Sequence, residues 1–159
     1  LHDGALQWFR GKQYPLEIIP KARANRIEMT PQAMRMHISV GADERARLHL
    51  LQGWQRRQAK QQLSALTPGW AHPLGVEVAE CRVRRMKTLW GSCNPLARRI
   101  WLNVDLIRYP LALFEYVLVH ELVHLLERGH NARFYGFMDE FLPDWRQRRE
   151  QLNGRYEID

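Results

Sequence analysis

The chain has 159 residues, of which 45% are hydrophobic and 26% are charged, with a formal net charge of +7. This balance is typical of a soluble globular protein of about one domain, and it excludes a disordered chain, a collagen-like repeat and a membrane bundle. The longest apolar stretch, Tyr116 to Leu126, is interrupted by His120, Glu121 and His124 and falls short of the roughly 20 residues that a membrane helix needs.

Arginine supplies 20 of the 24 basic side chains. Arginine suits bidentate contacts with phosphate or carboxylate, although genomic base composition produces the same bias. The two cysteines, Cys81 and Cys93, are too few for a disulfide scaffold or a four-cysteine zinc site. We therefore expect reduced thiols in the cytoplasm, and Leu1 to Arg10 lacks the pattern of a secretory signal.

The first 41 residues are predicted to form strands. Gly11-Lys12 separates Leu6–Arg10 from Tyr14–Ile19, as in a β-hairpin. Apolar residues then alternate with polar ones from Met34 to Val40, which is the period of a half-buried strand. We expect two units: a β-rich N-terminal segment over residues 1–41 and a second domain over residues 42–159.

Asp43 is a candidate N-cap for a helix over Glu44–Leu66, which Thr67-Pro68-Gly69 is expected to end. Its outer side carries Arg45, Arg56, Arg57 and Lys60. A solvated helix face is the favoured interpretation, and contact with nucleic acid is the alternative.

The remaining elements are predicted from periodicity and from proline, glycine and asparagine signals. They are strands over Gly75–Met86 and Ile100–Val104, a helix over Leu111–Arg128, a helix from Asn131 to about Leu142, and a last helix from Pro143 to Gly154.

The sequence His120-Glu121-Leu122-Val123-His124 carries the chemistry. Histidines four residues apart share one helix face, so their imidazoles can converge on one Zn²⁺. Glu121 is placed to take a proton from a zinc-activated water rather than to bind the metal. The alternative, a buried polar network without metal, is costly in free energy.

His130 is the candidate third ligand. A continued helix would point it away from the other two histidines, because six residues turn a helix through about 600°. We expect Gly129 to end the helix in a left-handed conformation and to redirect the chain. Metzincins share the spacing but carry a glycine where this chain has Glu127.

Several segments together resemble the YgjP-like metallopeptidases, relatives of the SprT-like proteins. They are Arg85–Cys93, Ile100–Asn103, Tyr116–Leu125 and His130–Tyr135. The resemblance implies an α+β, zincin-like fold, in which a small twisted sheet packs on the helix of the histidine motif and on a long backing helix. It also maps His120, His124 and His130 onto the family's zinc ligands, and Glu121 onto its general base.

Four further residues are candidates for contact with substrate. Trp90-Gly91-Ser92 could mark a sheet edge that accepts an extended peptide as an added strand, or a tight bend in which Trp90 merely packs. Asn103 could support the site from behind a ligand. Tyr116 and Tyr135 are candidates for stabilising the oxyanion.

We favour a cytoplasmic zinc hydrolase, most simply a metallopeptidase with one Zn²⁺ and a peptide or protein substrate. One alternative is a nucleoside triphosphate pyrophosphatase, acting on UTP-type substrates at the same metal. In it, Arg84, Arg85, Arg98 and Lys87 would grip the phosphates. A second alternative is a DNA-associated protease or binding module that uses the basic helix face.

Overall fold

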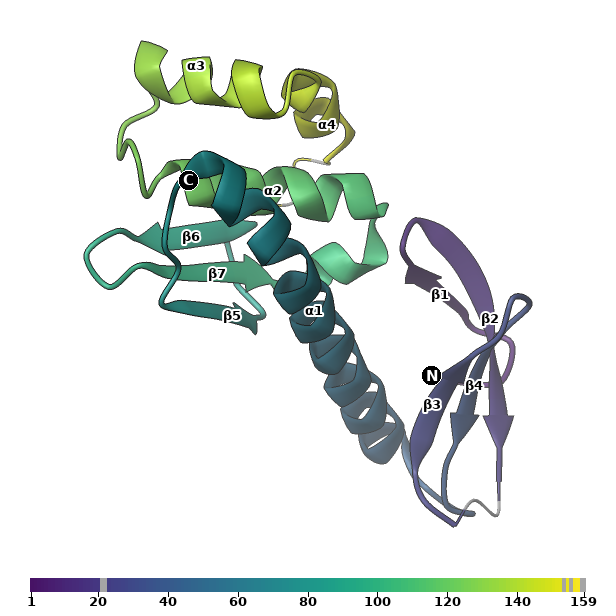
Figure 1. Cartoon of the computed structure of the whole chain (residues 1–159). Coiled ribbons are helices and arrows are strands. Elements are labelled where there is room, and N and C mark those ends of the chain that lie inside the picture. The colour runs from purple at the N-terminus through teal and green to yellow at the C-terminus, as the bar shows by residue number, and fades with distance from the viewer. Residues whose placement is uncertain (21–22, 153, 155, 158–159) are drawn as a thin grey trace.

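The computed structural model describes residues 1–20, 23–152, 154 and 156–157. Two small sheets lie at the two ends of a long helix, and three further helices stack beyond the second sheet (Figure 1). The mixed α+β fold expected from the sequence is confirmed.

The N-terminal sheet has the strand order β1-β2-β4-β3. Its strands are β1 (Leu6–Phe9), β2 (Lys12–Ile19), β3 (Arg26–Met29) and β4 (Met34–His37). The predicted hairpin is present, because β1 and β2 pair antiparallel across Gly11. The sequence analysis did not single out β3, because Arg-Ile-Glu-Met alternates polar and apolar residues over only four positions.

The tip of this hairpin packs on the rest of the chain. The backbone N–H groups of Arg10 and Gly11 donate to the carbonyls of Ile107 and Arg108. Gly11 has a φ of +83°, and a Cβ there would lie 2.8 Å from the ring of Pro110. The N-terminal sheet is therefore fastened to the segment that leads into the helix of the histidine motif.

Helix α1 runs over Glu44–Leu74, eight residues beyond the predicted end. Asp43 caps it as expected, since its side chain accepts from the N–H of Ala46. Pro68 and Pro73 do not break it, because both lie on the exposed side, where water can serve the carbonyls that they leave without an N–H donor. The helix ends at Gly75, which is left-handed at φ +68°.

The second sheet has the order β5-β7-β6, with β5 over Glu80–Arg84, β6 over Gly91–Asn94 and β7 over Arg99–Asn103. The first strand is shorter than predicted, and β6 was missed because Gly-Ser-Cys-Asn has low strand propensity. β6 pairs antiparallel with β7, and no other named strand pairs with it within the described chain.

The short 3₁₀ helix η1 (Val104–Arg108) leads into α2 (Leu111–Val123), and α3 (Ala132–Phe141) and α4 (Trp145–Gln151) follow. α2 packs against β6 and β7, with α1 beside it, while α3 and α4 cover its other side (Figure 1). Both α2 and α4 end earlier than predicted.

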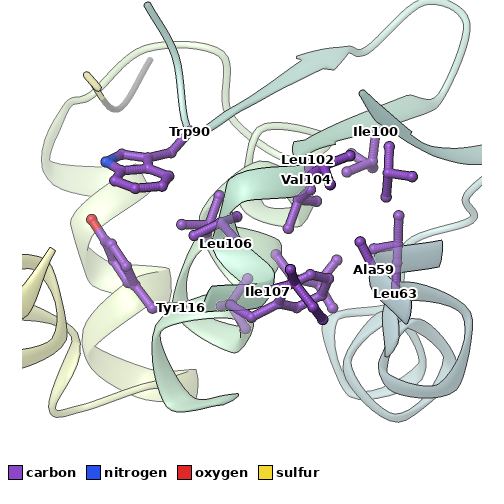
Figure 2. Close-up of a cluster of buried hydrophobic side chains, with 14 of the residues drawn as sticks. Ala59, Leu63, Trp90, Ile100, Leu102, Val104, Leu106, Ile107 and Tyr116 are labelled. Atoms are coloured by element: carbon purple, nitrogen blue, oxygen red, sulfur yellow. The ribbon is translucent and has the colours of Figure 1, made fainter. Parts of the chain in front are cut away.

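The core lies between these layers. Side chains from α1, β7, η1 and α2 interlock there, among them Leu63, Leu102 and Ile107 (Figure 2). Every residue of α2 from Tyr116 to Val123 is buried. The histidine motif is thus fixed on the most rigidly packed helix of the protein.

Candidate active site

The last turn of helix α2 and the residue that caps it, His124, bring the three residues of the motif together. His120 and His124 are 4% and 6% exposed, and Glu121 is fully buried. The ring centroids of the two histidines lie 4.9 Å apart. The helical spacing therefore places both imidazoles at one point, as the sequence predicts.

The third histidine arrives by a turn that Glu127, rather than Gly129, organises. Gly129 does not adopt a left-handed φ, so the predicted role of this glycine is wrong. The helix already ends at Val123, where the next turns tighten. The Glu127 carboxylate then accepts hydrogen bonds from the N–H of Gly129 and from the side chains of Asn131 and Arg133.

These bonds have an electrostatic consequence. The Arg133 guanidinium, with the donors on Asn131 and Gly129, holds the pKa of Glu127 below its ordinary value. Glu127 therefore stays ionised and keeps residues 127–133 in one arrangement. A glutamate followed by asparagine and arginine four and six residues later is the sequence signal that was overlooked.

The turn brings His130 to the other two histidines. His130 Nε2 lies 3.1 Å from His124 Nε2, and one ring nitrogen from each of the three histidines falls within 4.8 Å of the others. Two nitrogens bound to one tetrahedral zinc are about 3.3 Å apart, given a Zn–N distance of about 2.0–2.1 Å. The three-histidine donor set therefore suits a single Zn²⁺, and the distance of 3.1 Å between the Nε2 atoms of His124 and His130 is close to the spacing that one ion imposes.

Neighbouring groups fix the orientation of these rings. His124 Nδ1 lies 3.1 Å from the carbonyl oxygen of Glu127, which leaves Nε2 as the ligand atom. Phe134 of α3 packs on all three imidazoles, with centroid distances of 4.8, 4.7 and 5.1 Å. His130 is exposed, so the site is open to solvent on that side.

Gly91 of β6 makes room for Glu121. A Cβ at position 91 would lie 2.9 Å from Cγ1 of Val117 and 3.1 Å from both Cγ and Oε2 of Glu121. The absence of a side chain at Gly91 therefore allows Val117 and Glu121 of α2 to approach the strand closely. The edge strand lies directly against the carboxylate of the motif.

The other three candidates for substrate contact differ in their exposure to solvent. Trp90 is 1% exposed and packs edge-on against Tyr109 and Tyr156, so it offers a substrate no surface. Asn103 is fully buried, and its side chain donates to the carbonyls of Met86 and Leu89. It therefore holds the loop before β6 and does not serve as the hydrogen-bond acceptor of a ligand histidine. Ser92 is half-exposed on β6.

The two tyrosines also differ. Tyr116 is 1% exposed, and burial raises its pKa above the ordinary value. Tyr135 is half-buried and stacks on Trp145, with its ring 6.5 Å from that of His130. Only Tyr135 of this pair has exposed surface beside the ligand cluster.

A groove of about 460 Å³ opens at the histidines. Its walls are Cys93, Asn94, Pro95, Leu96, His124, Arg128 and His130. It runs between the end of β6 and the turn that carries the third histidine, so a chain lying along β6 would pass the candidate metal site. The sequence analysis did not foresee Leu96 and Arg128 as parts of this wall.

Comparison with known proteins decides the family. Residues 1–155 match the YgjP-like metallopeptidase domain. The chain belongs to the YgjP-like metallopeptidase family. The match confirms the resemblance seen in the sequence, and it includes the N-terminal sheet as well as the histidine motif.

A solved structure has a similar fold to part of this YgjP-like protein. It is similar to the crystal structure of the metallopeptidase zymogen abylysin from Pyrococcus abyssi, with a TM-score of 0.52 and 19% identity. The match covers 56% of this chain and 90% of that one. No curated protein sequence matches the chain. Among the described residues, every helix is too short or too polar to cross a bilayer.

The basic residues expected to grip a nucleotide do not form one cluster in this YgjP-like protein. Arg84, Arg85 and Lys87 line one hollow, whereas Arg98 pairs with Glu77 and does not line it. The grouping of these four residues around one triphosphate is therefore not what the fold produces.

Proposed function

We propose that this protein is a zinc-dependent peptidase in which Glu121 is the general base. The observation that carries the proposal is the convergence of His120, His124 and His130, with one ring nitrogen of each within 4.8 Å of the others, next to a buried glutamate on the same helix. This arrangement matches the chemistry of a metallopeptidase family.

His120, His124 and His130 would hold the ion through ring nitrogens. A Zn²⁺ held there would polarise a carbonyl and lower the pKa of a water to about 7. Glu121 would accept the proton of the attacking water and return it to the leaving amine. Its burial between α2 and Gly91 limits the carboxylate to a small set of positions, so proton transfer starts from a fixed geometry.

The edge of β6 is the proposed seat of the peptide. An extended segment can add to such an edge through main-chain hydrogen bonds. The chain itself does this just upstream, where Trp90 N–H donates to the carbonyl of Glu157 and Glu157 N–H donates to that of Thr88. A substrate paired with the remaining edge would place a peptide bond in the groove at His124 and His130.

A substrate panel tests this function. The zinc-loaded protein is incubated with a reduced, alkylated polypeptide and, separately, with nucleoside triphosphates, and products are identified by mass spectrometry. New peptide termini should appear, disappear with 1,10-phenanthroline and return with added zinc. Release of phosphate or pyrophosphate without any peptide cleavage would contradict the proposal.

A further inference from the structure

The outer face of the second sheet and the adjoining side of α1 carry a concentration of positive charge. Arg82 and Arg84 project outward from β5, and Arg56 and Lys60 lie one turn apart on α1. The basic face, as we call it, consists of Arg56, Lys60, Arg82, Arg84, Arg85 and Lys87, all of them exposed.

Three hollows connect these residues. The largest, about 640 Å³, includes Arg56 and Arg84 in its wall. A second contains Arg56 and Arg85, and a third contains Arg84, Arg85 and Lys87. Because each hollow shares an arginine with the next, the basic face is one continuous surface rather than scattered charges.

Few carboxylates neutralise this surface. Glu80 pairs with Arg82 and with the neighbouring Arg99, and the buried Asp105 pairs with Arg85. Within the part of the chain that the structure describes, the other cations of the face have no carboxylate oxygen within 4.0 Å. They are Arg56, Lys60, Arg84 and Lys87.

The basic face ends at the proposed peptide seat. Its third hollow includes Ser92 of β6, and the next residue, Cys93, lines the groove with His124 and His130. Ser92 thus links the peptide seat to the basic face, because Arg84 and Lys87 line the same hollow as Ser92, whereas the edge beside Thr88 and Trp90 is already paired with Glu157.

We infer that the basic face is an exosite for an acidic segment of the polypeptide substrate, an inference that rests on the proposed peptidase function. Charge complementarity selects glutamate and aspartate side chains. β6 has four residues, or about 13 Å at a rise of about 3.3 Å per residue, so the acidic run lies beyond the substrate residues that pair with this strand.

Aromatic packing favours a polypeptide over a single-stranded nucleic acid. Single-stranded nucleic acids need open aromatic faces on which bases stack. The only tryptophan in these hollows, Trp101, is half-exposed and is already covered by guanidinium groups, with Arg84 4.3 Å and Arg82 5.5 Å from its ring. Stacking instead holds the guanidinium of Arg84 ready for a bidentate contact with a carboxylate.

The exosite is tested by fluorescence anisotropy, with a protein variant that should not cleave the labelled peptides. The zinc-loaded Glu121→Gln protein is titrated with two labelled peptides that share one extended core, followed by either a run of glutamates or a run of glutamines. The glutamate peptide should bind more tightly. Replacing both Arg84 and Lys87 by glutamine should weaken it about three- to tenfold and leave the glutamine peptide unchanged.

Replacing Arg45 and Arg57 by glutamine is the matched control, because both are exposed on α1 and lie outside the three hollows. The control should bind the glutamate peptide as the parent does. Equal binding of the two peptides, or equal weakening by the control pair, would overturn the exosite. So would a single-stranded oligonucleotide that binds more tightly than the glutamate peptide and displaces it.

The proposed function can fail separately. If the wild-type protein cleaves no polypeptide while the Arg84 and Lys87 variant still loses affinity for the glutamate peptide, the peptidase proposal fails, and the basic face stands as a binding site for acidic polypeptides.

Discussion

Replacing Gly91 by alanine tests how tightly β6 constrains the glutamate of the motif. The new Cβ would lie 2.9 Å from Val117 Cγ1 and 3.1 Å from Glu121 Cγ, closer than carbon atoms normally approach. Both neighbours belong to the buried face of α2, so neither can move into solvent. Overpacking of this kind costs about 1–3 kcal/mol, which for a chain of this length lowers Tm by about 3–9 °C.

The same substitution should reduce catalysis at unchanged zinc content, because it displaces a carboxylate and touches no ligand. Thermal unfolding, zinc analysis and peptide cleavage are measured together. Gly136→Ala is the matched control: a Cβ there meets nothing within 4 Å in the interior of α3, so it should stabilise the protein by about 0.5–1 kcal/mol. A Gly91→Ala protein with wild-type Tm and activity would refute the packing argument.

Three further predictions concern the turn and the partly buried thiol of Cys81. Glu127→Ala should lower zinc affinity about tenfold by chelator competition, since it removes the acceptor that orders the turn, and His130→Ala should lower it more. Gly129→Ala should leave zinc affinity unchanged, because the glycine is not left-handed; a large loss there would restore its predicted role. Burial raises the pKa of Cys81 above its ordinary value, so at pH 8 it carries less thiolate and should react with iodoacetamide more slowly than in urea. Equal rates in the two conditions would contradict that burial.

Short sequence patterns predict which helices and strands form better than they predict where each one ends. Asp43 and Asn131 are side-chain caps whose bonds lie within three residues, and both were found from the sequence. The continuation of α1 through Pro68 depends on which side of the helix faces solvent, and that is a tertiary property. β6 exists because β7 and α2 cover it, since its own residues have little strand propensity.

The candidate site shows the same division. His120, Glu121 and His124 follow from helix geometry alone. The approach of His130 to the other two histidines was predicted, but it was attributed to a left-handed Gly129. The turn is instead held by hydrogen bonds from three residues to Glu127, and a search for periodic patterns does not detect such bonds. Trp90 was ambiguous between substrate contact and packing, and only its burial in the fold decides between them.

The comparison of wild type with Glu121→Gln at equal zinc content tests the central claim most directly. Both proteins are brought to one zinc per chain, and cleavage of an unfolded polypeptide is followed over time. The variant should keep its zinc and its Tm, since glutamine preserves the shape of the side chain, and should cleave about 10²- to 10⁴-fold more slowly. Equal turnover in the two proteins would contradict the assignment of Glu121 as the general base.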